Sequence, residues 1–535
     1  MRPSLTLPLF ILIWISSYSL YAQSGPGGVG NGTGTSGQPA NKLWLRADAG
    51  AFSDAGVTAA VNNATVYQWN DFSDNSFHAL QTTAGSRPTF KTAILNGKPV
   101  LRLNGTTHQM LMNAGLNNAS VLPMAFFAVI NNTTNPKGLF DSRPLAPNCF
   151  RFFNDGSGPG ANNSVEFHNN NPAKGSLNLS TSGSVISILA GLDGSSNRQL
   201  DAYITGTQIG SVETGNTDPV VFNSARLGSI NTGSDGFFNG DVAEVIYFNS
   251  EINEAQRIIV ENYLGAKYGL SLSSNEYYTN TSHIENLIGI GTTDGTQKHT
   301  QANGGGIWLS EDEATLDGTN EFLFAGHNGT VHNAANASNL LNLSVIASGI
   351  TTRWAREYRL EKTGNLDANI TFDYTQAGLS RASNTGEDFF LLYRSATGAT
   401  NFTIVPLKST ADASIPGRVT FSVANGNLLN GYYTLGLKSQ PGAGTLYTYT
   451  ANCSGGCNWN STNSWTTDPT GLLLVNSRVP RTIDNVTILN GNSVTADYDI
   501  QVVTGTIQSG GTLTLAPNSA NTFTTLSGSG LLKLS

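Results

Sequence analysis

The chain has 535 residues, of which only 12% are charged, and its formal net charge is −8. An average soluble protein carries roughly 25% charged residues. The polar character here comes instead from Asn, Thr and Ser, together with 59 glycines. Such a composition suits strands and turns on an extracellular surface better than a helical cytosolic enzyme. The Lys and Arg residues form no cluster that could hold phosphates, which argues against nucleic acid as a partner.

The first 22 residues have the pattern of a secretory signal peptide. Arg2 supplies the positive start, residues 5–15 are largely apolar, and small residues precede a cleavage point after Ala22. The polar residues that follow leave the apolar run short of the about 20 residues that a membrane span needs. We therefore expect a protein that is secreted or held at the outer cell surface, with no transmembrane segment after the signal is removed.

The next segment, residues 23–41, is rich in glycine and has no apolar period, so it predicts a flexible linker. From residue 42 to about 240, short β-prone runs alternate with turns rich in Gly, Asn, Asp and Pro. Many short strands separated by such turns are typical of a sandwich or jelly roll. We assign this first β domain to residues 42–270.

The clearest helix signal lies at the end of this domain. An apolar run from Val242 to Phe248 predicts a buried strand. The apolar residues after it fall three or four positions apart, as they do on one face of a helix: Ile252, Ala255, Ile259, Tyr263 and Ala266. Ser250 is the predicted N-cap and Gly269 the predicted stop. We expect this helix to mark the boundary between two β domains.

Two acidic residues, Asp241 and Glu244, lie on the predicted strand before the helix. A buried carboxylate needs a partner, and the sequence offers Arg46, Arg102 and Arg226 without choosing among them. We expect a structural ion pair here, not a catalytic group.

Residues 271–440 repeat the strand-and-turn habit with other sequences and predict a second β-sandwich. Residues 441–446 then read as a linker. Residues 447–535 hold very short strands separated by Asn-Gly, Gly-Gly and Gly-Ser-Gly, which suggests the first coils of a β-solenoid. Because a solenoid needs about three repeats and a cap, we expect this last region to be incomplete. The predicted fold class is therefore all-β throughout.

The first domain resembles the concanavalin A-like, laminin-G-like domains of exported Bacteroidetes proteins. The matching residues follow in a consistent order: 43–48, 69–75, 87–89, 96–102 and 240–269. The resemblance implies a two-sheet jelly roll that often binds carbohydrate or surface proteins and sometimes carries a calcium ion. Residues 271–440 look like a companion domain of such proteins that has no assigned activity.

The richest polar cluster spans residues 69–78. Asp71, Asp74 and Asn75 could offer oxygen ligands to calcium, an ion that takes six to eight such donors. The candidates for ligand contact in the same stretch are Trp69, Asn70 and Phe77, with the two rings suited to stacking on a sugar. The alternative is a turn in which Asn and Asp satisfy local backbone amides and Trp69 packs in the core.

Two further loops carry residues of the kind found at lectin rims: Arg143, Asn154, Asp155, Asp235 and Phe237. Exposed polar loops occur on any sandwich, so the structural alternative stays open for them as well.

Three cysteines fit an exported protein that relies on core burial more than on disulfides. Cys453 and Cys457 flank Ser-Gly-Gly and are candidates for a small disulfide. No second Cys or His pair with ligand spacing follows them, which argues against zinc.

No catalytic pattern stands out in the sequence. The paired-carboxylate spacing of jelly-roll glycosidases does not occur, and no Gly-x-Ser-x-Gly motif accompanies the histidines. We predict a secreted or cell-surface multidomain binding protein that recognises carbohydrate or a surface polymer. The alternatives are a structural stalk or adhesin without glycan binding, and a polysaccharide-acting enzyme whose catalytic part lies beyond residue 535.

Overall fold

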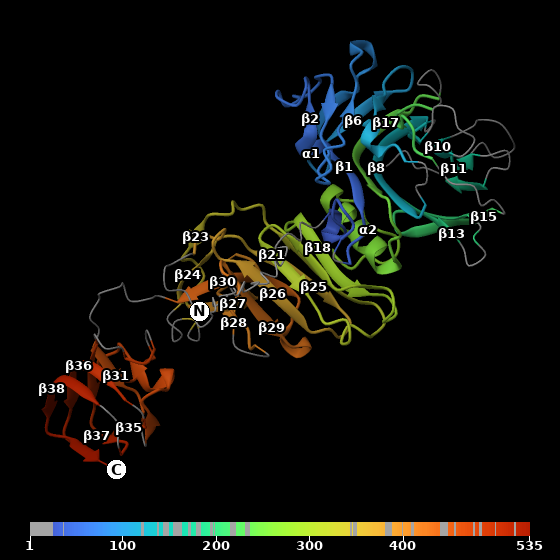
Figure 1. Ribbon diagram of the computed structural model, residues 1–535. Coiled ribbons are helices and arrows are strands. Elements are labelled where there is room, and N and C mark those ends of the chain that lie inside the picture. Colours follow the sequence, from blue (N-terminus) through green and yellow to red (C-terminus); the bar gives the residue numbers. More distant parts are fainter. Residues whose placement is uncertain are drawn as a thin grey trace, which may run out of the picture.

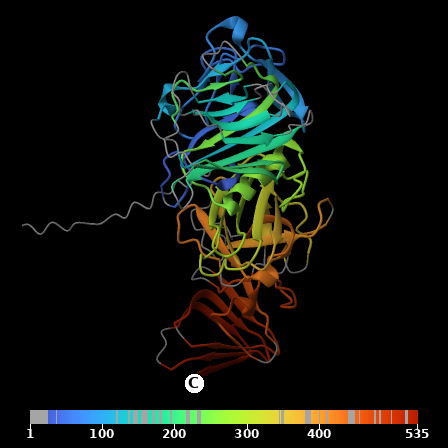
Figure 2. The same ribbon diagram turned by 90° about the vertical axis from the view of Figure 1, so that its right-hand side faces the viewer.

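The computed structural model describes residues 25–534, apart from 36, 119–121, 136–137, 143–148, 154–162, 169–172, 178–182, 193–195, 197, 215–220, 231–235, 343–344, 346–349, 380–387, 399, 408–410, 439–447, 454–455, 475–476, 481–483, 498 and 518–520. The described chain is mostly β, as predicted, and forms several sheets. Two antiparallel sandwiches and a region of parallel coils follow one another in chain order (Figures 1 and 2).

The first sandwich has two sheets. The sheet next to the long helix, here called the helix-side sheet, has the order β15-β14-β13-β8-β17-β6-β5, with β1 on β17. Its strands are β1 (Asn41–Arg46), β5 (Thr89–Leu95), β6 (Lys98–Asn104), β8 (Met124–Asn135), β13 (Ser184–Leu192), β14 (Arg198–Ile204), β15 (Thr207–Thr214) and β17 (Asn239–Phe248).

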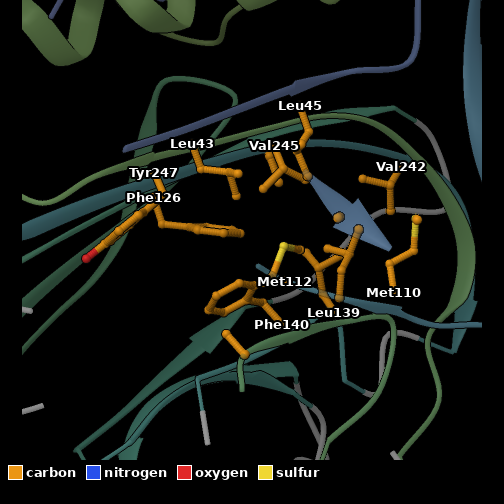
Figure 3. Packing of buried hydrophobic residues seen from close by; sticks show 14 of the residues in the cluster. Leu43, Leu45, Met110, Met112, Phe126, Leu139, Phe140, Val242, Val245 and Tyr247 are labelled. Atoms are coloured by element: carbon orange, nitrogen blue, oxygen red, sulfur yellow. The ribbon is translucent and has the colours of Figure 1, made fainter. Parts of the chain in front are cut away.

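The opposite sheet of the first sandwich has the order β12-β11-β10-β9-β16-β7-β4-β3-β2. Its strands are β2 (Ala51–Phe52), β3 (Gln68–Trp69), β4 (Ala79–Leu80), β7 (Met110–Leu111), β9 (Phe140–Asp141), β10 (Cys149–Phe153), β11 (Asn163–His168), β12 (Ala173–Leu177) and β16 (Arg226–Leu227). Side chains such as Leu43, Phe126 and Val245 on one sheet face Met112 and Phe140 on the other and form the core between them (Figure 3).

The predicted helix is α2 (Glu254–Tyr268), and it ends at Gly269, whose φ of 64° is left-handed as expected for a C-cap glycine. Its N-cap is Asn253 and not Ser250: Asn253 accepts the amide of Gln256, and the Gln256 side chain accepts the amide of Asn253, which makes a capping box. The Ser250 hydroxyl instead accepts the amide of Ala40 and ties down the start of β1.

The second sandwich lies on the other side of α2 (Figure 1). Its larger sheet joins β18 (Glu285–Thr292), β19 (Lys298–His299), β22 (Glu321–His327), β23 (Ala335–Asn336), β24 (Ile350–Trp354), β25 (Tyr358–Thr363), β27 (Phe389–Arg394), β28 (Thr403–Ile404) and β30 (Gly431–Lys438). Its smaller sheet joins β20 (Gln301–Gly304), β21 (Ile307–Ser310), β26 (Ala368–Asp373) and β29 (Arg418–Val423).

Helix α2 packs in a third hydrophobic core, which lies between the two sandwiches and is separate from the core inside each of them. One hydrophobic cluster joins Phe127 and Ile246 of the helix-side sheet, Ile259 of α2, and Phe322 and Phe324 of β22. A surface helix would keep a polar face toward water, but nearly every residue of α2 is buried. We call this layer, with α2 at its centre, the seam.

Residues 25–30 of the glycine-rich segment are part of the seam, which differs from the flexible linker predicted for 23–41. Residues 26–28 form a short 3-10 turn (η1, Pro26–Gly28) that is buried, and Val29 is fully buried in the same cluster as α2. The reason is close approach: a Cβ on Gly28 would lie 2.5 Å from the Cβ of Ala302. Residues 25–30 are called the strap below.

The last region contains stacked coils with two parallel sheets, the pairing that a solenoid requires. One sheet runs β31 (Thr448–Ala451), β34 (Asn485–Ile488), β36 (Gln501–Ile507) and β38 (Thr522–Gly528), with β33 (Trp465–Thr466) antiparallel on β31. The other runs β32 (Cys457–Asn458), β35 (Ser493–Ala496), β37 (Thr512–Leu515) and β39 (Leu531–Leu534). Buried Trp459 and Trp465 fill its core, and Cys453 and Cys457 form a disulfide at its start.

Candidate functional site

A cavity of about 230 Å³ opens at the seam between the two sandwiches. The first sandwich and α2 supply side chains, the second sandwich supplies two stretches of chain, and the strap closes one side. The lining residues are Gly25, Gly27, Trp44, Arg46, Phe72, Tyr263, Asn286, Leu287, Ile288, Asn303, Gly304 and Gly305. We call it the seam pocket.

Three aromatic rings and one guanidinium form the wall of the seam pocket on the side of the first sandwich. Trp44 lies on β1, Phe72 follows β3, and Tyr263 lies on α2. The ring of Trp44 meets the other two edge to face, with centroids 6.5 Å from Phe72 and 6.2 Å from Tyr263. The Arg46 guanidinium carbon lies 5.2 Å from the ring centroids of both Trp44 and Phe72, a cation–π geometry.

A buried carboxylate behind the wall fixes two of these rings. Glu244 on β17 is fully buried. It accepts hydrogen bonds from four side chains: Trp44 Nε1 (2.5 Å), Tyr263 hydroxyl (2.9 Å), Lys267 Nζ (2.7 Å) and Tyr268 hydroxyl (2.8 Å). A carboxylate so surrounded holds its donors in one orientation. The rings of Trp44 and Tyr263 are therefore held in place without a ligand.

The partners of the two strand carboxylates are now defined. Asp241 pairs with Arg102 at 2.6 Å, one of the three arginines that the sequence offered. Glu244 pairs with Lys267 of α2, which sequence inspection did not consider. Lys267 lies 23 positions along the chain, and only the folding of α2 onto β17 brings the two together.

The charges around the seam pocket balance. Arg46 pairs with Asp48 at 3.2 Å, and Asp48 also accepts Lys267 Nζ at 3.1 Å. Burial alone would raise the pKa of Asp48, but Lys267 and Arg46 outweigh it and hold that pKa below its ordinary value. Burial alone would lower the pKa of Arg46, but Tyr263, Asp48 and Glu244 outweigh it and raise it. Two cations thus face two carboxylates.

The opposite wall is formed by residues 286–288 of β18, by Asn303 and Gly304 of β20, and by Gly305 in the turn between β20 and β21. The Gly305 carbonyl on this turn accepts Arg356 Nη1 at 2.6 Å and the Tyr358 hydroxyl at 2.6 Å. These two bonds hold the turn from behind. Gly305 itself has φ +64°, a conformation that favours glycine.

The predicted cluster at 69–78 adjoins the seam pocket but uses its residues differently. The Asp71 carboxylate accepts four hydrogen bonds: Oδ1 from the amides of Trp44 (2.8 Å) and Ser73 (2.9 Å), and Oδ2 from the Ser73 hydroxyl (2.8 Å) and the Phe77 amide (2.9 Å). Asp71 thus shapes the turn and fastens it to β1. The ring that this turn delivers to the pocket is Phe72.

The aromatic residues proposed for sugar stacking lie elsewhere. Trp69 is fully buried in the core of the first sandwich, so it cannot stack on a ligand from that position. Phe77 is half-buried against the same core, and Asn70 Oδ1 accepts Gln68 Nε2 at 2.7 Å. None of the three lines the seam pocket.

The calcium candidates fit a turn as they are arranged. Both Asp71 oxygens are already hydrogen bonded, and Asn75 Nδ2 donates to the Asn41 carbonyl at 3.0 Å and to the Ser73 hydroxyl at 2.9 Å. Asp74 is exposed, with a left-handed φ of 66°. Within the described part of the chain, no three His, Cys, Asp or Glu side chains gather as a metal site would require. Calcium binding by Asp71, Asp74 and Asn75 stays a prediction.

Four of the predicted rim residues, Arg143, Asn154, Asp155 and Asp235, lie outside the described residues. Phe237 is half-buried and does not line the seam pocket. No helix among the described residues is long and apolar enough to cross a membrane.

Sequence inspection did not single out Trp44, Arg46, Phe72 or Tyr263 as ligand-contacting residues. Trp44 and Arg46 lie in the stretch 43–48 that carries the family resemblance, and Phe72 lies inside the predicted cluster. Tyr263 was assigned to the apolar helix face. What these residues share is an aromatic or cationic side chain near a buried carboxylate. This arrangement can be recognised only when β1, β17 and α2 are placed together.

No family model matches the chain, and no curated protein matches it. Among solved structures, it is similar to a GH54 α-L-arabinofuranosidase soaked with a cyclic sulfate inhibitor, with 13% identity, 61% of this chain and 79% of that chain covered, and a TM-score of 0.31. It is also similar to the binding domain of Paraclostridial Mosquitocidal Protein 1 (12% identity, 75% and 98% covered, TM-score 0.30). A third is the native heptameric SAP-like pentraxin from Limulus polyphemus (9% identity, 30% and 78% covered, TM-score 0.23).

Proposed function

We propose that the protein is a secreted or cell-surface binding protein that holds an uncharged carbohydrate, free or within a surface polymer, in the seam pocket. The observation that carries the proposal is the wall formed by Trp44, Phe72 and Tyr263 around a guanidinium already paired with Asp48. Sugar rings offer apolar C–H faces to aromatic rings and hydroxyls to fixed polar groups, which is the combination present here.

The size and charge of the seam pocket narrow the ligand. About 230 Å³ is below the roughly 300–1,000 Å³ of drug-sized sites, so the pocket suits one sugar ring. Because Arg46 and Lys267 are balanced by Asp48 and Glu244, no net charge is available to attract an anionic sugar. A neutral saccharide is therefore preferred over a uronic acid or a sulfated sugar.

The residues of the pocket support binding better than hydrolysis. Glycoside hydrolysis needs two carboxyl groups about 5–10 Å apart on either side of the bond. The lining of the seam pocket contains no Asp or Glu, and Glu244 behind it is occupied by four donors. A polysaccharide-acting enzyme would need a centre elsewhere.

The test is a glycan array with the full chain, followed by titration of any neutral saccharide that binds. Phe72→Leu removes a ring from the pocket wall and keeps an apolar side chain. Loss of an aromatic contact is worth about 0.5–1.5 kcal/mol, so we expect binding to weaken roughly three- to tenfold. Phe77→Leu, the same change in the same turn but outside the pocket, is the matched control and should bind like the parent.

Two results would contradict the proposal: no neutral saccharide bound by the full chain, or equal losses in the two variants. The first result would favour a structural stalk, since the sandwiches and coils lie in a row (Figure 2). Solution scattering that shows a compact particle would then exclude the stalk.

A further inference from the structure

A second cavity, of about 340 Å³, lies on the helix-side sheet beyond the N-terminus of α2. Its apolar floor includes Leu189 and Gly191 of β13. Met124 of β8 also lines the cavity, but its side chain belongs to the core of the first sandwich. Leu200 and Ala202 of β14 point into the sandwich core, so Asp201 between them lies on the other face of the sheet, in the cavity wall. Glu251, in the connection from β17 to α2, also lines the cavity. We call this second cavity the outer-face pocket.

The outer-face pocket differs from the seam pocket in charge. Its lining holds two carboxylates, Asp201 and Glu251, and no Lys or Arg. Asp201 accepts Gln199 Nε2 at 3.3 Å and Gln208 Nε2 at 3.2 Å, two long bonds from neutral amides. Neither carboxylate forms an ion pair with any residue that the structure describes.

The nearest helix cation does not neutralise this pocket. Arg257 of α2 is buried, pairs with Glu254 and Glu261, and stacks 3.9 Å from the ring centroid of Tyr203. Its charge is therefore already compensated within the helix. Among the residues that the structure describes, none supplies a counter-charge to these two carboxylates, and bringing a cation between them would be favourable.

We propose that the outer-face pocket binds an alkylammonium group, the side chain of a lysine on a partner polypeptide. The four-carbon stem of lysine would cover Leu189 and the sheet floor, and its ammonium would lie between Asp201 and Glu251. Leu192 at the rim is 55% exposed and gives the flanking residues of the partner an apolar contact. The absence of any aromatic ring from the lining makes the pocket a poorer sugar site than the seam pocket.

Gly191 offers a way to fill the pocket without disturbing the fold. It lies on β13 without a left-handed φ, and an added Cβ would find its nearest neighbour, Pro123 Cβ, at 4.0 Å, an ordinary contact. Gly191→Leu should therefore fold, keep both carboxylates and occupy the floor with its own side chain. A loss of binding in this variant locates the ligand.

The experiment measures, by NMR, the binding of two small probes to the full chain. The probes are Nα-acetyl-lysine methylamide and Nα-acetyl-norleucine methylamide. The probes share the stem and differ in the ammonium. We expect the lysine probe to bind at least fivefold more tightly, to weaken with added salt, and to weaken at least fivefold in Asp201→Asn and in Gly191→Leu. Glu313→Gln, which removes an exposed charge from the second sandwich, is the control and should bind like the parent.

Equal binding of the two probes, or unchanged binding in Gly191→Leu, would overturn the proposal. The proposal would also be overturned if a neutral saccharide bound the parent chain and did not bind Gly191→Leu, because the pocket would then recognise hydroxyls and not a cation. The result is independent of the seam pocket, since none of these substitutions touches its lining.

Discussion

The junction between the two sandwiches differs from the junction between the second sandwich and the coils. Between the sandwiches lie α2 and the strap, in one hydrophobic cluster that includes residues of both. Between the second sandwich and the coils, the structure shows a hydrogen bond from Lys438 Nζ to the Ser477 carbonyl at 2.6 Å. The chain that connects them includes residues 439–447, which lie outside the described part.

This contrast shows where a site can be shared between modules. A pocket built from two modules keeps its shape only if their relative position is fixed, and the seam provides that through a buried helix. The coils instead bury their side chains between successive turns of the same region, with Trp459 and Trp465 4.6 Å apart at the centroids. Substitutions in the seam should therefore affect both sandwiches and leave the coils unchanged.

The largest effect should come from Glu244→Ala. The substitution leaves Asp48 as the remaining carboxylate partner of Lys267 and removes the carboxylate acceptor from Trp44 and Tyr263. The Tyr268 hydroxyl keeps only a long bond to the Ala243 carbonyl, at 3.4 Å. Removing one partner of a buried ion pair costs about 3–5 kcal/mol. Denaturant unfolding followed by tryptophan fluorescence should show both sandwiches unfolding earlier, together.

The matched variant is Trp465→Ala, which should cost a similar amount, about 3–5 kcal/mol, in the coils alone. If Glu244→Ala shifted only one sandwich, or cost less than about 1 kcal/mol, the seam would not be a shared core.

A smaller loss should follow from Gly28→Ala in the strap. Gly28 has φ +91°, and an added Cβ would lie 2.5 Å from Ala302 Cβ, so the variant combines backbone strain with a clash. We expect a loss of about 2–5 kcal/mol, since overpacking costs about 1–3 kcal/mol and a left-handed L-residue about 1–2 kcal/mol. Gly37→Ala is the control: its φ is +73° and its Cβ would meet nothing within 4 Å.

Only the difference between the two variants, measured by thermal unfolding, reports on the strap. Equal losses would mean that the strap does not press against the second sandwich.

The strap also makes the seam sensitive to pH through His299. This side chain is buried on β19, and its Nε2 donates to the Gly28 carbonyl at 3.0 Å. Burial lowers the pKa of His299 to about 4, although the Gly28 bond opposes the shift. An unfolded His has a pKa of about 6.5. The stabilising contribution of the neutral ring is therefore complete above about pH 6.5 and declines as pH falls toward 4.

Over that range the loss due to His299 is about 3 kcal/mol, at 1.36 kcal/mol per unit of pKa. His299→Gln keeps a donor for the Gly28 carbonyl but does not titrate. Unfolding free energies measured between pH 7 and pH 4.5 should fall less steeply in the variant than in the parent. Parallel curves would show that His299 is already exposed to protonation in the folded chain.

The strand and helix at 239–268 were predictable from local patterns: the strand contains an almost continuous apolar run, and the helix has apolar residues three or four positions apart. The cap was not, since Ser250 and Asn253 are both good N-caps and only the capping box with Gln256 distinguishes them. Composition likewise predicted flexibility for the strap. The sequence alone does not distinguish a glycine that allows two segments to pack closely, as Gly28 does, from a glycine that makes the chain flexible.

The candidate site was predictable only in part. A turn was one of the two interpretations of the cluster at 69–78, but the rings proposed for the ligand were Trp69 and Phe77, and the ring in the pocket is Phe72. Trp69 is the last residue of β3, and its side chain faces the core of the first sandwich. The turn shaped by Asp71 places Phe72 at the seam. Trp44 and Tyr263 come together across more than two hundred residues, which no local pattern encodes.

The smallest effect should come from removing calcium. The turn at 71–77 holds its shape through four hydrogen bonds to Asp71, so we expect the same melting temperature in EDTA and in millimolar calcium. Partial desolvation of the Asp74 carboxyl group, and then the Asp71 charge, raise the pKa of Asp74, and a bound cation would lower it again. A rise in melting temperature with calcium that is lost in Asp74→Asn, but kept in the turn variant Asp54→Asn, would establish the ion. It would also place a divalent cation beside the seam pocket, whose preference for neutral sugars would then have to be measured again with calcium present.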